Sequence, residues 1–146
     1  MKITWIIIAF LAGTFLPIQA GLNTRLGKAI ESPVHASLIS FIIGAFTVLL
    51  YCLVTKQYVA WAGMKSAPIY VWLGGALGAF YVTAIILAFP QIGPAMTFGL
   101  VVAGQMIISV LLDHFNILVA QQHSINIWKL SGIVLIVLGV IIIRRF

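Results

Sequence analysis

Four uncharged polar side chains lie deep inside long apolar stretches of this chain, and they are its best candidates for chemistry. They are Gln19, Asn23, Tyr81 and Gln105. A polar group buried in hydrocarbon is costly unless it is hydrogen-bonded. Gln19 and Asn23 are four residues apart and therefore share one face of a helix. Two interpretations stay open: these groups bond one another between helices, or they line a solute cavity. Gln19, Tyr81 and Gln105, together with Ser40, fall at neighbouring depths on four helices, which favours a cavity.

The ionisable residues exclude several classes of function. The only acids, Glu31 and Asp113, fall at the ends of the apolar stretches. A proton-coupled exporter of hydrophobic cations normally needs a carboxylate inside a span, and this chain has none. His35 lies near the start of a stretch, while His114 and His123 lack partners at metal-ligand spacing. Because no nucleophile motif, phosphate loop or metal cluster occurs, we expect no enzyme, no metal and no cofactor.

The polar residues are carried by five apolar stretches. Each has about 20 residues, which as a helix spans the ~30 Å core of a bilayer. Hydrophobic residues form 63% of the 146-residue chain, and its mean hydropathy is +1.21. We therefore predict an all-α membrane protein with one integral membrane domain over residues 1–146 and the lipid bilayer as its surroundings. The predicted helices cover residues 3–24, 33–55, 68–90, 94–112 and 127–143.

Helix-start and helix-stop residues mark the gaps between these stretches. Ser32-Pro33 and Gly93-Pro94 each place proline at a first helical position, where its missing N–H does no harm. Asn126 can cap the last helix, and Pro90 is predicted to end the third. Pro17 lies inside the first helix, where the lost hydrogen bond predicts a kink.

The basic residues are divided evenly between the two sides of the membrane. Orientation normally follows an excess of Lys and Arg on one side, so an even division predicts insertion in both directions. The residues are also isolated from one another, which favours lipid head groups over nucleic acid as their partner. One side would hold Lys2, Lys56, Lys65 and Lys129, and the other Arg25, Lys28, Arg144 and Arg145.

Small residues predict where helices approach one another closely in lipid. Gly74 and Gly78 have the GxxxG spacing on the third helix, and Gly132 and Gly139 lie seven apart on the fifth. We interpret all four as helix-packing residues, and Gly139 indicates that the fifth helix is a dimer contact. The second helix carries a similar face, made of Ser37, Ser40, Gly44 and Thr47.

Several of these segments resemble a known family across essentially the whole chain. Residues 17–27 (PIQAGLNTRLG) and 102–105 (VAGQ) are the more specific motifs, and residues 40–44, 74–79 and 112–115 support them. Together they resemble the YdcZ-like branch of the drug/metabolite transporter superfamily. The last three helices are also similar to part of the small multidrug resistance proteins, and residues 135–140 (LIVLGV) resemble the motif through which those proteins dimerise.

This resemblance implies half of a ten-helix inverted-repeat transporter. A single half needs a partner, either a second copy in a homodimer or a related subunit in a paralogous heterodimer. We therefore expect a transporter of small organic solutes in the bacterial inner membrane, working by alternating access as an antiparallel homodimer. The first-helix glutamate of the small multidrug proteins has no counterpart here, so their proton-coupled antiport does not carry over.

Two alternatives remain at this point. The chain could be a non-transporting structural or regulatory membrane subunit whose polar residues only hold helices together. A channel would need a continuous polar lining, which these apolar helices do not supply.

Dual insertion is directly testable. We expect a carboxyl-terminal reporter active only inside the cell and one active only outside it both to give signal, because neither side holds an excess of basic residues. Two lysines added to one side should bias the ratio. Signal from one reporter alone would exclude inverted homodimers made from this chain.

Overall fold

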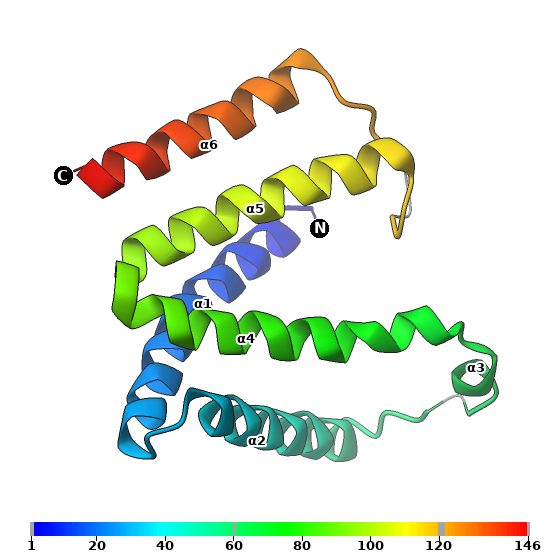
Figure 1. Ribbon diagram of the computed structural model, residues 1–146. Helices are drawn as coiled ribbons and strands as arrows, with labels where there is room; N and C mark the ends of the chain where they lie inside the picture. The colour runs from blue at the N-terminus through cyan, green and yellow to red at the C-terminus, as the bar shows by residue number, and fades with distance from the viewer. Residues whose placement is uncertain (1, 60, 120–121, 146) are drawn as a thin grey trace. The chain divides into compact units, whose positions relative to one another are not determined.

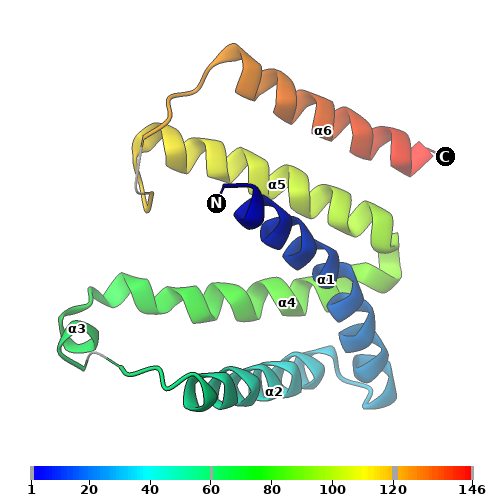
Figure 2. The same ribbon diagram turned by 180° about the vertical axis from the view of Figure 1, so that it is seen from behind.

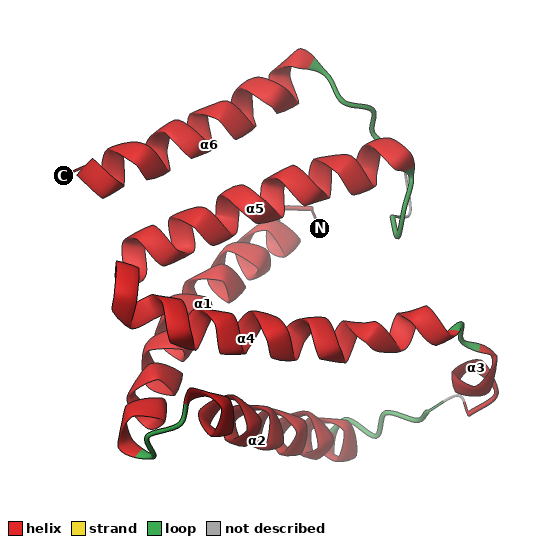
Figure 3. Ribbon diagram, in the orientation of Figure 1, coloured by secondary structure: helices red, strands yellow, loops and turns green. Residues whose placement is uncertain are grey.

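The computed structural model describes residues 2–59, 61–119 and 122–145, and within these ranges every regular element is helical (Figure 3). The chain divides into two compact units, one ending at Gln91 and the other beginning at Ile92. In chain order the elements are α1 (Lys2–Ala29), α2 (Pro33–Val54), α3 (Trp61–Ser66), the 3₁₀ helix η1 (Ile69–Trp72), α4 (Leu73–Ile92), α5 (Pro94–Phe115) and α6 (Ile127–Arg145).

The described residues include five helical segments long and apolar enough to cross a membrane, as predicted. α1 runs to Ala29, past the predicted end at residue 24, and α5 runs to Phe115. The third span begins as η1 and continues as α4. The short helix α3 was not predicted.

The prediction that Pro90 ends the third helix is wrong, because α4 continues through it to Ile92. Proline removes the hydrogen bond to the carbonyl four residues earlier, and here the helical conformation still continues for two more residues. The chain turns at Gly93 instead, where φ is 78°. Glycine adopts this left-handed conformation without strain, so α5 can begin at Pro94 directly after one non-helical residue.

The other predicted helix starts are confirmed. The Ser32 side chain accepts a hydrogen bond from the His35 N–H at 3.3 Å, which caps α2 before Pro33. The Asn126 Oδ1 accepts one from the Lys129 N–H at 2.9 Å, which caps α6. These local bonds satisfy backbone donors that the first helical turn leaves free.

In the first unit α1 packs on α2, and α4 joins them. At Gly27 an added Cβ would lie 3.3 Å from the Pro33 Cα and 3.5 Å from side chains of Ala36 and Ile86, so the helices lie close together there. α1 changes direction part-way along its length (Figures 1 and 2), and Pro17 lies inside this helix. This agrees with the predicted kink.

In the second unit α5 and α6 form an antiparallel helical hairpin (Figures 1 and 2). A Cβ added at Gly99 would lie only 2.9 Å from the Val140 Cγ2, so glycine is what lets α6 approach α5 there. At the loop end, the Lys129 Nζ lies 3.3 Å from the Asp113 Oδ2 and donates to the His123 carbonyl at 2.8 Å. Asp113, which lies in the last turn of α5, is thus paired with a basic side chain.

Little of each span is buried within the single chain. Only 6% to 11% of the residues in the most apolar window of each span are buried. In water such exposure would be unfavourable, whereas in a bilayer lipid tails or other helices cover it.

We expect Gly99→Ala to lower the free energy of unfolding by about 1–3 kcal/mol, because the new methyl group overlaps the stiff Val140 side chain. Reversible unfolding in mixed micelles measures the change. Val140→Ala in the same chain should restore part of it.

Gly104→Ala is the matched control on the same helix, because a Cβ there meets nothing within 4 Å. Its effect should stay within about 0.5 kcal/mol. Equal losses from both substitutions would contradict close packing at Gly99.

Candidate functional site

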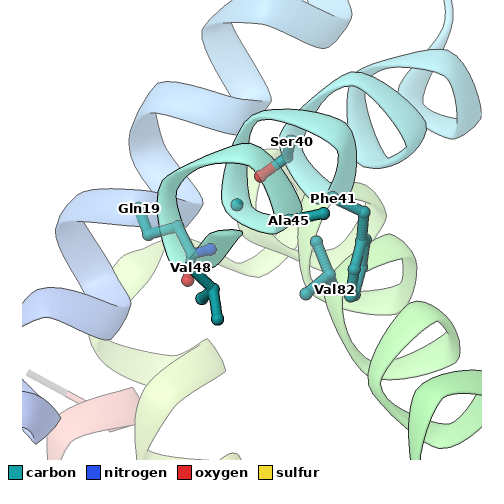
Figure 4. A pocket seen from close by; sticks show the side chains of 7 residues that line it. Gln19, Ser40, Phe41, Ala45, Val48 and Val82 are labelled. Atoms are coloured by element: carbon teal, nitrogen blue, oxygen red, sulfur yellow. The ribbon is translucent and has the colours of Figure 1, made fainter. Parts of the chain in front are cut away.

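A cavity of about 440 Å³ lies among α1, α2 and α4 of the first unit. Figure 4 shows Gln19 reaching from α1 towards Val48 of α2, with the Phe41 ring near Val82 of α4. A volume of this size suits a small organic molecule. The lining residues are Gln19, Ser40, Phe41, Gly44, Ala45, Val48 and Val82.

The cavity lies along the interior of the apolar spans. Gln19 precedes the end of α1 by ten residues and Ser40 follows the start of α2 by seven. At ~1.5 Å per residue, these positions are roughly 15 Å and 10 Å from the connected ends of the two helices. Val82 precedes the end of α4 by ten residues, at a similar depth. Solute sites of secondary transporters commonly lie near this level.

The two polar groups of the lining are available to a ligand. Within the described ranges, neither the Gln19 amide nor the Ser40 hydroxyl makes a hydrogen bond to another residue. The hydroxyls of Ser37 and Thr47, by contrast, each donate to a carbonyl of their own helix, four residues earlier. Ser40 has no such bond and faces the cavity.

The small-residue face of α2 thus has two roles, although the sequence predicted packing for all of it. Ser37 is buried, and its Oγ accepts a hydrogen bond from the Thr83 hydroxyl of α4 at 2.9 Å. One turn further on, Ser40 and Gly44 line the cavity, and a Cβ at Gly44 would meet nothing within 4 Å. Val48 continues the same face at the four-residue spacing of a helix.

Gly78 makes room for the aromatic wall of the cavity. A Cβ built on it would lie 3.7 Å from the Phe41 ring, so the ring faces the side-chain-free surface of α4 at Gly78. The sequence predicted a packing role for Gly78, and within the first unit it does contact another helix. Gly74, its GxxxG partner, has nothing within 4 Å of a built Cβ.

Asn23 and Tyr81, both predicted to bind solute, are not among the lining residues. Asn23 is 8% exposed, one turn along α1 from Gln19. The Tyr81 hydroxyl is buried, and so is that of Thr24, and neither has a hydrogen-bond partner in the described parts of the chain. Both hydroxyls are thus enclosed by the first unit and do not face the cavity.

Gln105, the fourth predicted residue, belongs to α5 in the second unit. Its side chain is exposed and makes no hydrogen bond to any residue in the described segments. Gly132 and Gly139 of α6 also have open space around a built Cβ. The surfaces around these three residues are therefore available for contact with something outside the second unit.

Phe41, Ala45, Val48 and Val82 were missed as lining residues. They are ordinary apolar residues on helices that are apolar all round, so their type carries no signal. The four-residue spacing of Ser40, Gly44 and Val48 was the available clue.

The cavity wall contains no ionisable residue. Across the described residues, no group of three or more His, Cys, Asp or Glu side chains could hold a metal ion. The arrangement supports reversible binding through hydrogen bonds and apolar contact.

The chain was compared with known proteins. Residues 4–142 match the model of a family described as "Putative inner membrane exporter, YdcZ". The chain belongs to the YdcZ family. It is also similar to the inner membrane protein YdcZ of Escherichia coli (strain K12), with 29% identity over 94% of each chain. No solved structure gives a significant match.

Membership of the YdcZ family agrees with the resemblance drawn from the motifs. Together with the five apolar helices, it makes this chain a multi-pass inner-membrane protein. The family description is that of an exporter and not of an enzyme.

The bond between Ser37 and Thr83 can be tested by a double-mutant cycle. We expect Ser37→Ala and Thr83→Val to be coupled by roughly 0.6–1.7 kcal/mol in the free energy of unfolding, the range for hydrogen bonds between membrane helices. Pairing Ser37→Ala with Thr47→Val is the control, because the Thr47 hydroxyl bonds only its own helix, at the Ile43 carbonyl. Zero coupling in the first pair would contradict the bond.

Proposed function

We propose that this YdcZ-family protein exports small organic solutes across the inner membrane, and that the cavity among α1, α2 and α4 is part of the path. The observation that carries the proposal is the pair of free polar groups, Gln19 and Ser40, in an otherwise apolar cavity at membrane depth. Polar groups without partners are unfavourable in hydrocarbon, so their presence at a cavity is best explained by a ligand.

The transporting unit in this proposal is an antiparallel homodimer. The exposed amide of Gln105 lies roughly midway along α5, where contact with lipid tails would be unfavourable. A second copy, or a solute held between two copies, would cover it. Five spans per chain and an even division of basic residues are compatible with two oppositely inserted copies. A paralogous chain could serve as the partner in the same way.

In such a dimer the solute would contact Gln19, Asn23 and Gln105 through hydrogen bonds and Tyr81 through its ring face. Alternating access requires helices to tilt while the site stays near the midplane. The Pro17 bend in α1 and the open space around Gly74 offer places where tilting meets little resistance. Gly78, in contact with Phe41, would move together with α2.

Proton coupling through a buried carboxylate is not part of the proposal. Glu31 follows the end of α1 and Asp113 is paired with Lys129 at the end of α5. Neither lies where it could hold a cation and a proton in turn at the midplane.

The alternative is a structural or regulatory membrane subunit, and the Ser37–Thr83 bond favours it to some extent. This bond has the form of simple interhelical hydrogen bonding. A packing-only protein should lose stability on Gln105→Leu or Asn23→Leu, and no solute should raise its melting temperature. A transporter should be stabilised by its solute.

Transport is tested in two stages. A thermal-shift screen over neutral metabolites and quaternary amines first identifies a stabilising compound, and counterflow of that compound is then measured in proteoliposomes. We expect Gln19→Leu and Gln105→Leu each to reduce counterflow at least tenfold, because each removes a hydrogen bond to the solute.

Gly104→Ala is the control for reconstitution, since its position is open and outside the proposed site. Undiminished counterflow in Gln105→Leu would remove Gln105 from the site. The absence of any stabilising compound together with normal folding would favour the structural subunit.

A further inference from the structure

We propose that the cavity among α1, α2 and α4 selects uncharged amphipathic molecules that combine a flat ring with one hydrogen-bonding group. This inference rests on the proposed transport function, because it names the class of solute that this part of the path would take. It is drawn from the composition of the cavity wall and from the way the Phe41 ring is held.

The wall has a hydrogen-bonding part and an apolar part. Gln19 offers an amide that both donates and accepts, and Ser40 offers a hydroxyl, with neither group bonded elsewhere in the described chain. The remainder is the Phe41 ring with Ala45, Val48 and Val82. A ligand with one uncharged polar group and an apolar body would match both parts.

The same cavity wall disfavours a charged ligand. None of the lining residues can neutralise an ion, and the cavity lies roughly 10–15 Å from the connected ends of α1 and α2. An unpaired ion transferred to such surroundings loses far more hydration free energy than an uncharged amide does. Amide and hydroxyl dipoles replace the few hydrogen bonds of a neutral group, and they do not replace the hydration shell of an ion.

The flat-ring preference follows from Phe41. Its ring faces Gly78 of α4, which has no side chain, and a Cβ built there would lie 3.7 Å and 3.8 Å from two ring atoms. α4 thus flanks the ring on one side, while the ring also forms part of the cavity wall. An aromatic ligand gains offset stacking or edge contact on a ring held this way. Gly78 is a positioning residue in this arrangement.

Three probes with the same indole ring separate the charge classes. Indole-3-acetamide is neutral, tryptamine is a cation and indole-3-acetate is an anion at pH 7.5. Binding is measured by saturation-transfer NMR on the full-length protein in lipid nanodiscs. We expect the acetamide to bind at least tenfold more tightly than the two ions, and Gln19→Leu to weaken the acetamide at least tenfold.

A second pair of variants tests the ring support. Gly75→Ala, on the same helix, should leave acetamide binding unchanged, because a Cβ there meets nothing within 4 Å. Gly78→Val should weaken binding at least tenfold, because a branched side chain pushes the Phe41 ring into the cavity. Phe41→Leu added to Gly78→Val should restore folding stability but not the preference for a ring. The melting temperature of each variant separates these effects from unfolding.

The outcomes distinguish this inference from the proposed function. If tryptamine or indole-3-acetate binds as tightly as the acetamide, and Gln19→Leu weakens that binding equally, the preference for uncharged ligands is overturned. The cavity then still stands as a solute site. Absence of acetamide binding in nanodiscs, where lipid can fill the cavity, overturns the inference itself. Counterflow of a screened compound judges the transport proposal independently in both cases.

Discussion

Every polar group at membrane depth must find a hydrogen-bond partner inside the protein, because lipid tails offer none. This constraint organises the helices. The hydroxyls of Ser37, Thr47 and Thr83 bond carbonyls of their own helices, and Thr83 also reaches Ser37 across the gap to α2. The groups left without partners are then informative. Gln19 and Ser40 meet at a cavity, and their free hydrogen-bonding capacity is what gives that cavity a binding character.

Glycine serves opposite purposes at different places in these helices. At Gly99 the missing side chain lets α6 approach α5 as far as Val140, and at Gly27 it lets the start of α2 lie against α1. At Gly44 the missing side chain leaves open space in a cavity wall. Gly93 is needed for its backbone conformation, since φ is 78° there. A glycine in a membrane helix therefore identifies a close contact only when its neighbours are known.

The absence of an acid inside the spans constrains energetics as well as chemistry. A buried carboxylate would require a counter-ion or a proton, and its protonation would couple transport to pH. Asp113 avoids this by pairing with Lys129 near the membrane surface, where water also reduces the cost of charge. The cavity is consequently suited to molecules that carry no charge themselves, and exchange of such molecules can proceed without an accompanying ion.

The positions of the spans and most of their ends were predictable from the sequence. Hydropathy over about 20 residues is a local property, and so is capping by Ser32, Gly93 and Asn126. Pro90 misled the prediction because a proline near a helix end changes one hydrogen bond and leaves the turn to the following glycine. Gln19 was singled out from the sequence, and it lines the cavity.

Tertiary structure alone decided which side of each helix faces which neighbour. These spans are apolar all round, so hydrophobic periodicity does not reveal their rotation in lipid as it does in water. Ser37 and Ser40 therefore looked alike in sequence, and only packing separates a serine bonded to Thr83 from one facing a cavity. The same reason explains why Phe41 and Val82 went unnoticed. The apolar composition of the spans determined that this chain is a membrane protein. The rotation of its helices about their axes decided where a molecule could bind.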